Sequence, residues 1–449
     1  MKDVLCYVLA GGEGSRLRPL TTGVRAKPAV YFAGGNRRLI DFPLSNSVNS
    51  GVNKIAVLTM HESTSLLRHL DRAWKPKFHT MMEGAFLVSL FPTYRTSKEF
   101  VGSADAIYQH LDQLDSGNPV PTQALILGGD HIYKMNYCEY RKQHEDTKAA
   151  LTVAGIPVSF NDQANYDVKP DGSKRFKFGI FGVDENWKIT SFREKPEECS
   201  PIFKDLELKD RPGQVLASMG IYFFTKEAMV GVLNDDAKDI ESKHDLGGNI
   251  VPKMISKSFP VFAYDFSKNS RAGNPAYWED VGDPDKYFKC HLDLVRSEPL
   301  FDLGNLEWRI HGFDGNLPPA RITSNGHPGV VLDSLLCEGS WIRGSKVRSS
   351  VIGPDVYIGP YIKDEIKDLA FFNIDECVIF LHAKIGPNVK LHRTIVEKGV
   401  EIPEGIEIGY DKEKDSSLVG FHEKTGKEMK LTISSGGVRV IPRHFTFKK

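Results

Sequence analysis

Short apolar runs that end in glycine or polar residues recur through the first 290 residues. They lie at Val4–Ala10, Lys54–Thr59, Ala124–Leu127 and Ala150–Ala154. Runs of this length with such boundaries predict buried β-strands.

Amphipathic stretches, such as Ser63–Trp74 and Ala104–Leu114, separate these predicted strands. Alternation of strands and helices predicts the α/β class, with a mostly parallel sheet and helices on both of its faces. Ligands bind such sheets at the carboxyl ends of the strands. The glycines after Ala10 and the carboxylate of Asp130 both follow a predicted strand, so they are candidate site residues.

Beyond about residue 330 the period changes to six. Branched apolar residues recur at this spacing in three pairs, often followed by glycine: Ile352 and Ile358, Ile385 and Leu391, Ile402 and Ile408. A hexapeptide period predicts a parallel β-helix, in which each coil stacks its apolar residue on the next. The segment Lys363–Leu369 interrupts the repeat and is expected to protrude as a loop.

These patterns divide the chain into three parts. Residues 1–290 form the predicted α/β domain and residues 331–449 the predicted β-helix. The intervening residues 291–330 read as a linker that begins as a helix and contains Pro299, Pro318, Pro319 and Pro328. The charged tail from Asp411 onward has only weak periodicity.

Composition narrows the function classes. The 58 basic residues balance the 58 acidic ones, which argues against nucleic acid or an anionic membrane as a partner. There is no apolar run of about 18 residues to span a membrane. The N-terminus reads as a core strand and not a signal peptide, and the six cysteines are far apart, so we expect a cytoplasmic protein with reduced thiols.

The first chemical motif is the glycine-rich run Ala10–Arg16, followed by Lys27. Glycines allow the backbone to approach a ligand closely, and successive N–H groups can bind phosphate oxygens. Arg16 and Lys27 can add positive charge to the phosphates. The glycines alone fit a tight strand-to-helix turn equally well.

Two aspartates are candidate metal ligands. Asp130 follows Gly129 at a predicted strand end, and Asp280 lies in Tyr277–Asp283. Carboxylate oxygens suit Mg²⁺, although each aspartate could equally cap a strand or a turn. The two assignments support each other only if the fold brings the carboxylates together.

Two further segments could hold a sugar phosphate. In Phe192–Pro196, Lys195 could bind the phosphate and Glu194 could accept hydrogen bonds from sugar hydroxyls. In Leu216–Tyr222, Ser218 lies near a glycine and leaves room for a sugar ring. An exposed charge pair before a proline and an ordinary core strand are the structural alternatives.

Taken in order, these segments resemble the ADP-glucose pyrophosphorylases. Ile40–Gly51, Ser103–Ala106 and His244–Gly247 are further matches, and the resemblance spans nearly the whole chain. It implies a Rossmann-like nucleotidyltransferase domain, a left-handed β-helix and commonly a homotetramer. It also implies conversion of ATP and glucose 1-phosphate to ADP-glucose and pyrophosphate for glycogen or another α-glucan, under allosteric control.

The resemblance also assigns roles by position. Asp130 matches the catalytic, metal-linked aspartate with Asp280 as its partner for Mg²⁺, and Arg16 and Lys27 match triphosphate-binding positions. The nucleotide is assigned to Leu9, Ala10, Gly11, Gly12, Gly14, Ser15 and Gly129. Glucose 1-phosphate is assigned to Phe100, Gly179, Glu194, Lys195 and Ser218.

Several residues depart from the family pattern. Phe100 replaces a tyrosine that contacts glucose 1-phosphate, Val101 an arginine, and Met60 a glutamine. Phe91–Arg95 occupies the place of a segment that carries glutamines near the base, so the preference for adenine is less secure than the reaction type. Val24 replaces an activator-binding lysine, which predicts altered regulation, either by a different effector or with little activation by fructose 1,6-bisphosphate.

Three alternatives stay open at this point. The chain could use another base or sugar phosphate, UTP for example, or be a weakly catalytic regulatory subunit of a hetero-oligomer. A hexapeptide acyltransferase is the third, although His382 and His392 lack a surrounding motif. We interpret His61 and His131 as packed or surface histidines without a catalytic role.

Overall fold

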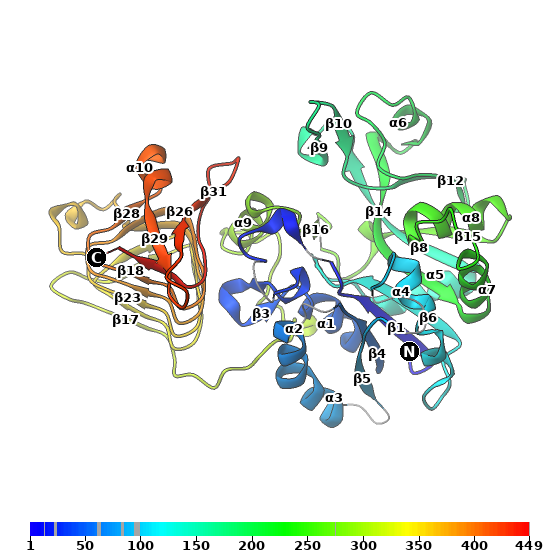
Figure 1. Ribbon diagram of the computed structural model, residues 1–449, viewed down its shortest axis with the longest axis horizontal. Helices are drawn as coiled ribbons and strands as arrows, with labels where there is room; N and C mark the ends of the chain where they lie inside the picture. The colour runs from blue at the N-terminus through cyan, green and yellow to red at the C-terminus, as the bar shows by residue number, and fades with distance from the viewer. Residues whose placement is uncertain are drawn as a thin grey trace.

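The computed structural model describes residues 1–12, 14–21, 25–60, 64–81, 85–93, 99–273 and 275–448. An α/β unit that contains the N-terminus lies beside a β-helix that contains the C-terminus (Figure 1). The predictions made for Val24 and His61, and for Tyr94 and Arg95 of the base segment, lie outside the described residues.

The α/β unit is built on a ten-stranded sheet with the main order β12-β11-β14-β6-β1-β4-β5. Four neighbouring strands are parallel: β6 (Gln123–Gly128), β1 (Val4–Leu9), β4 (Lys54–Leu58) and β5 (Phe86–Leu90). The predicted runs account for β1, β4 and β6 but not for β5.

The other half of this sheet is largely antiparallel, which the prediction of a mostly parallel sheet did not include. The long strand β14 (Arg211–Thr225) runs antiparallel to β6 and to the neighbours that flank it. Its pairing with β8 shifts register between Ser218 and Tyr222. Besides β6, the strands that pair with β14 are β8 (Leu151–Ser159), β11 (Ile180–Val183) and β13 (Glu207–Leu208). At the outside, β12 (Ile189–Arg193) pairs antiparallel with β11, and β15 (Val261–Asp265) pairs in parallel with β8.

Helices cover both faces of the sheet, as predicted. Alternate residues of β1 enter two different hydrophobic cores, so both faces of this strand are buried. One core contains side chains of α1 (Asp41–Asn49), α2 (Thr64–His69), α3 (Lys75–Met81) and α5 (Tyr137–Asp146). The other contains side chains of α4 (Ser103–Tyr108), α7 (Lys226–Asp236) and α8 (Val251–Ser256).

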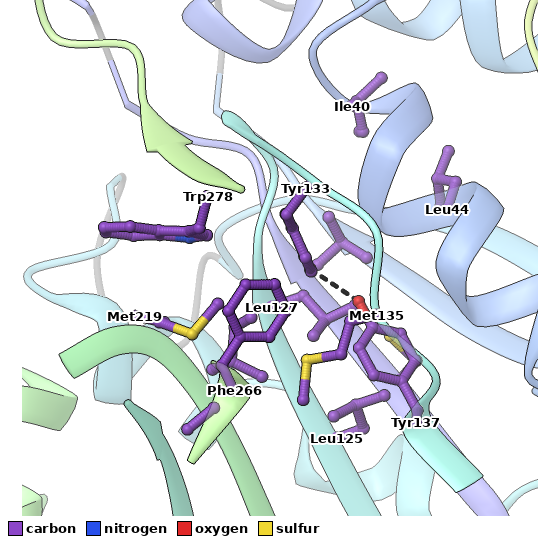
Figure 2. Close-up of a cluster of buried hydrophobic side chains, with 14 of the residues drawn as sticks. Ile40, Leu44, Leu125, Leu127, Tyr133, Met135, Tyr137, Met219, Phe266 and Trp278 are labelled. Carbon is purple, nitrogen blue, oxygen red and sulfur yellow. Dashed lines mark hydrogen bonds between the residues drawn. The ribbon is translucent and has the colours of Figure 1, made fainter. Parts of the chain in front are cut away.

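The first of these cores includes Leu125 and Leu127 of β6 and Met219 of β14. In Figure 2 the hydroxyl groups of Tyr133 and Tyr137 meet within the cluster, at 2.6 Å. Met219 and Trp278 lie at its edge in the same view, and both also line the cavity described below. The apolar core therefore supports the floor of that cavity directly.

The motif Ile40–Gly51 has a structural role. Asp41 is fully buried at the start of α1, and its carboxylate accepts hydrogen bonds from His69 Nε2 at 2.6 Å and Trp74 Nε1 at 2.7 Å. Asn46 joins two other segments, since its side chain donates to the Tyr133 carbonyl and accepts from Trp308. Buried polar groups need such partners, so this motif fixes how several segments pack.

The C-terminal unit is a parallel β-helix, and the predicted fold class is confirmed. Its strands stack into two sheets, ordered β17-β20-β23-β25-β27-β33 and β18-β21-β24-β26-β32. The six hexapeptide residues are at most 2% exposed, and Lys363–Leu369 is a largely exposed segment around a 3₁₀ turn at Asp364–Lys367. The strands named here are β17 (Arg321–Thr323), β18 (Val330–Leu332), β20 (Trp341–Arg343), β21 (Lys346–Arg348), β23 (Tyr357–Ile358), β24 (Ile374–Ile379), β25 (Lys384–Ile385), β26 (Lys390–Val396), β27 (Glu401–Ile402), β32 (Arg439–Ile441) and β33 (Phe445–Phe447).

The ends of the β-helix extend beyond the hexapeptide pattern. Strand β17 lies within the segment expected to be a linker and pairs with β20. In the charged tail, after α10 (Lys412–Ser417), β32 and β33 pair in parallel with β26 and β27. The helix α9 (Pro284–Leu292) ends just inside the segment expected to be a linker, so nearly all of it precedes that segment.

The two units share a hydrophobic core. Phe32 and Tyr287 from the α/β unit cluster with Phe380, Ile395 and Val440 from the β-helix. A buried ion pair between Arg25 and Glu397 at 2.7 Å crosses the same boundary. No helix in the described ranges is long and apolar enough to cross a membrane.

Candidate active site

A cavity of about 460 Å³ opens at the carboxyl ends of β1, β4 and β6. This is where ligands bind in open α/β sheets. Backbone hydrogen bonds hold the three strand ends together, from the Ala10 N–H to the Leu58 carbonyl at 2.8 Å and from the Gly129 N–H to the Leu9 carbonyl at 2.9 Å.

The glycine-rich loop forms one wall of the cavity. Leu9, Ala10, Gly11 and Gly12 line it, with Met60 packed against Gly11. The other predicted nucleotide residues, Gly14, Ser15 and Gly129, support the loop from outside the lining. Gly14 has a φ of +62°, and a Cβ there would lie 2.7 Å from Lys27 Cβ, so only glycine lets the loop pass this close to Lys27.

Lys27 joins the two predicted carboxylates. Its Nζ lies 2.7 Å from Asp130 Oδ2 and 2.9 Å from Asp280 Oδ1. The carboxylates meet because β7 (His131–Tyr133) pairs antiparallel with β16 (Trp278–Asp280), which places His131 opposite Asp280. The condition set by the sequence, that the fold bring the two aspartates together, is therefore met.

The charges of this cluster reinforce one another. Burial lowers the pKa of Lys27, but the charges of Asp130 and Asp280 outweigh it, and the net shift is upward. Burial raises the pKa of Asp280, but Lys27 outweighs it, and the net shift is downward. Lys27 and Asp280 are therefore both ionised at neutral pH.

The donor set at this cluster suits a hard divalent cation. One ligand atom from each of Asp130, His131 and Asp280 falls within 4.8 Å of the others. The two carboxylates supply the oxygen ligands that Mg²⁺ prefers. His131 Nε2 lies 3.5 Å from Asp130 Oδ1, while its buried Nδ1 has no hydrogen-bond partner among the described residues.

The opposite wall carries the residues predicted for the sugar phosphate. Gly179, Glu194, Lys195 and Ser218 all line the cavity. The Ser218 N–H donates to the Gly179 carbonyl at 2.8 Å, and a Cβ on Gly179 would lie 2.7 Å from Glu194 Oε2. Burial raises the pKa of Glu194, and the nearby charge of Asp245 adds to this shift.

Phe100 also lines the cavity. Its ring packs edge-to-face on His110, with 6.0 Å between ring centroids, and His110 Nε2 is 2.9 Å from the Phe91 carbonyl oxygen. Packing on His110 thus connects Phe100 to the start of the base segment. Val101 is 65% exposed.

The predicted site residue Arg16 forms its ion pair with another segment of the α/β unit. Its guanidinium forms an exposed ion pair with Asp167 at 3.0 Å and does not line the cavity. A Cβ on Gly282, two residues after Asp280, would lie 4.0 Å from the same guanidinium.

Several residues that line the cavity have no site role predicted from the sequence. They are Ser103, His131, Tyr222, Asp245, Gly247 and Trp278. Ser103, Asp245 and Gly247 lie in segments noted only as family matches, and Tyr222 and Trp278 lie in motifs noted for a neighbouring residue. His131 was interpreted as a packed or surface histidine, and it does pack edge-to-face on Trp278, although in the cavity wall.

Comparison with known proteins agrees with the two-unit fold. The family model described as nucleotidyl transferase matches residues 6–297, and the one described as GlmU-like, C-terminal hexapeptide matches residues 318–427. Proteins named glucose-1-phosphate adenylyltransferase are similar over nearly the whole chain. The protein from Leifsonia xyli subsp. xyli is 38% identical, with 98% of this chain and 99% of its own length covered. The one from Koribacter versatilis is 36% identical, with 99% and 97% covered.

Proposed function

The chain belongs to the nucleotidyl transferase family, among the glucose-1-phosphate adenylyltransferases, and from this premise we propose that it makes ADP-glucose and pyrophosphate from ATP and α-D-glucose 1-phosphate. One observation carries the proposal: Lys27 bridges Asp130 and Asp280 between a glycine-rich wall and a wall containing Glu194 and Ser218. The cavity thus offers one wall to each substrate and a charged centre where they meet.

The reaction needs no covalent nucleophile. A phosphate oxygen of the sugar attacks the α-phosphorus of ATP in line, a new P–O bond forms, and the bond to the β-phosphate oxygen breaks to release pyrophosphate. The protein must therefore position two polyanions and stabilise charge on the leaving group. In this proposal Lys27 contacts the triphosphate, together with Arg16 once it leaves Asp167.

The two aspartates of this cluster are the proposed ligands of a metal ion. Asp130 and Asp280 would hold Mg²⁺, which when bound supplies Lewis-acid stabilisation of phosphate charge. One ammonium facing two carboxylates leaves the cluster with a surplus negative charge, which favours a cation there. On the acceptor side, Glu194 would accept hydrogen bonds from sugar hydroxyls while Lys195 binds the phosphate.

The alternatives from the sequence gain no support. The relatives' names specify adenylyl transfer, which favours ATP over UTP. A weakly catalytic regulatory subunit would tolerate loss of the charged centre, yet Lys27, Asp130 and Asp280 are hydrogen-bonded to one another. The acyltransferase alternative rests on the β-helix alone.

The proposal extends to the assembly, location and regulation of the protein. We infer a homotetramer that acts in the cytoplasm, supplies ADP-glucose for glycogen synthesis and responds to allosteric effectors. Family membership supports each of these. Sedimentation of the purified chain tests the tetramer, and a monomer at assay concentration would contradict it.

The decisive experiment is a matrix of ATP, UTP, GTP and dTTP against several sugar 1-phosphates, read as pyrophosphate release. We expect the highest kcat/KM with ATP and glucose 1-phosphate, and loss of activity with excess chelator that added Mg²⁺ restores. A clear preference for UTP would contradict the adenylyl assignment.

A further inference from the structure

We propose that His244 and Asp236 are positioning residues, which fasten the sugar-phosphate wall of the cavity to the wall formed by the start of α4. Neither side chain lines the cavity. The inference rests on the proposed function for its effect on catalysis. The contacts that carry it are independent of that function.

The two walls meet at Ser103, the first residue of α4. Its Oγ donates to Asp245 Oδ2 at 2.9 Å and accepts the Leu246 N–H at 2.8 Å. All three residues line the cavity. A single hydroxyl therefore joins the start of α4 to the loop that follows α7.

The backbone of His244 reinforces this joint. Its carbonyl oxygen accepts the Ala104 N–H at 2.7 Å. The approach is so close that a Cβ on Gly102 would lie 2.3 Å from the same oxygen. The position of the His244 carbonyl thus determines how the start of α4 sits against the loop.

His244 adopts a backbone conformation that few non-glycine residues take. Its φ is +51°, in the left-handed region that persists only where the surroundings hold it. Its imidazole is held by Asp236 at the end of α7, with 2.8 Å between Nδ1 and Oδ2. The Asp236 side chain is only 3% exposed.

Ser242 connects the Asp236 carboxylate to the backbone of His244. Its Oγ donates to Asp236 Oδ1 at 2.9 Å and accepts the His244 N–H at 3.0 Å. Both oxygens of the buried carboxylate are therefore used to hold the backbone at His244. We call the set Asp236, Ser242 and His244 the latch.

The loop held by the latch reaches the predicted sugar-binding residues. A Cβ on Gly247 would lie 3.4 Å from both Glu194 Oε2 and the Tyr222 hydroxyl. A shift of the loop would therefore move Gly247 relative to Glu194, the residue proposed to contact sugar hydroxyls. The latch thus acts on glucose 1-phosphate through the loop.

The test compares two substitutions at one position. His244→Gly keeps the left-handed backbone but removes the imidazole, whereas His244→Asn also tolerates this φ and restores a donor toward Asp236. We expect His244→Gly to raise the KM for glucose 1-phosphate about tenfold, the scale of one lost charged hydrogen bond. The KM for ATP should change less, and His244→Asn should recover most of the loss.

Amide hydrogen exchange provides a readout that does not depend on activity. His244→Gly should speed exchange at the Ala104 and Leu246 amides, and His244→Asn should not. Asp235→Asn is the matched control, because Asp235 is a more exposed neighbour that pairs with Lys257 at 2.7 Å. If His244→Gly does not fold, Asp236→Asn replaces it and should act in the same direction.

The outcomes separate the two proposals. A folded His244→Gly with unchanged KM and unchanged exchange overturns the latch, as does a His244→Asn that behaves like His244→Gly. Wild-type protein that makes no pyrophosphate from ATP and glucose 1-phosphate contradicts the proposed function, and the exchange data still decide whether the latch exists.

Discussion

Arg25 and Lys27 lie two residues apart on one segment, yet they serve two different regions. Each forms an ion pair with a nitrogen–oxygen distance of 2.7 Å. Glu397, the partner of Arg25, is 2% exposed in the boundary with the β-helix, whereas the two carboxylates around Lys27 are 28% and 32% exposed in the cavity. Equal contact geometry thus accompanies very different access to ligands.

The balance of charge separates the two regions further. At the boundary one guanidinium meets one carboxylate, and the pair is closed to solvent. In the cavity one ammonium meets two carboxylates, and the surplus negative charge is accessible. A buried ion pair without net charge suits a structural role between two units. A solvent-accessible cluster with net negative charge suits a site where a cation or a phosphate binds.

Glu397→Gln should cause the largest change. It leaves the Arg25 guanidinium buried without its counter-charge, and breaking a buried ion pair in this way costs about 3–5 kcal/mol. Thermal unfolding should show a large loss of stability, with little change in the KM for ATP in the protein that stays folded. Glu401→Gln is the control, since its ion pair with Lys384 is exposed. A small loss of stability for Glu397→Gln would contradict a structural role for the ion pair between Arg25 and Glu397.

Asp130→Asn should have the opposite profile. It removes a charge from the open cluster, and we expect kcat to fall about 10²- to 10³-fold, the range for loss of one charge-stabilising group. The melting temperature should change little. Pyrophosphate release measures the effect, and Asp115→Asn, at an exposed ion pair with Lys226, is the control. Near-normal turnover would remove Asp130 from the proposed site.

Asp375 in the β-helix allows a test of pH-dependent stability at a carboxylate outside the cavity. Burial raises the pKa of Asp375, but hydrogen bonds from His392 and Arg348 outweigh it and hold the pKa at about 2. Because this pKa is lowered, its stabilisation is present above pH 4 and is lost as the pH falls toward 2.

We expect that loss to be about 1–2 kcal/mol. Asp375→Asn should flatten the pH dependence of β-helix unfolding between pH 4 and 2, measured by circular dichroism. Asp333→Asn, at an exposed position of the same unit, should not. Identical pH profiles for wild type and Asp375→Asn would show that the assigned interaction is absent.

Arg16→Gln should have the smallest effect on stability. Exposed ion pairs are worth about 0–1 kcal/mol, so loss of the contact with Asp167 should barely change the melting temperature. The KM for ATP should nevertheless rise, because the arginine is proposed to turn to the triphosphate. Asp167→Asn, which frees Arg16, should leave that KM unchanged or lower it. An unchanged KM in Arg16→Gln would place Arg16 outside the site.

The sequence predicted the parts of the molecule that depend on local pattern. The strand at Val4–Ala10 appears as β1, and each hexapeptide residue from Ile352 to Ile408 is buried, because burial and periodicity are readable along a single segment. The antiparallel half of the sheet was not predicted, since strand direction depends on pairings across distant segments. The register shift of β14 at Ser218–Tyr222 has the same origin.

The residues of the candidate site also divide into those that a local motif predicts and those that only the folded chain brings into place. The glycine loop, Asp130 and Glu194 lie in recognisable motifs, and the structure places them in or beside one cavity. The side-chain direction of Arg16, which pairs with Asp167 from a remote segment, could not be read from the chain. The latch was also hidden, because the backbone conformation of His244 and its contact with Ala104 exist only in the folded protein.

The position of β32 near the end of the chain determines when the joint between the two units can form during synthesis. Val440 in this strand belongs to the core shared by the two units, together with Phe32 and Tyr287, which lie far earlier in the chain. A ribosome makes Phe32 long before Val440. The joint between the units therefore stays unfinished until translation has passed residue 441, and a nascent chain shorter than this carries an incomplete boundary around Arg25 and Glu397.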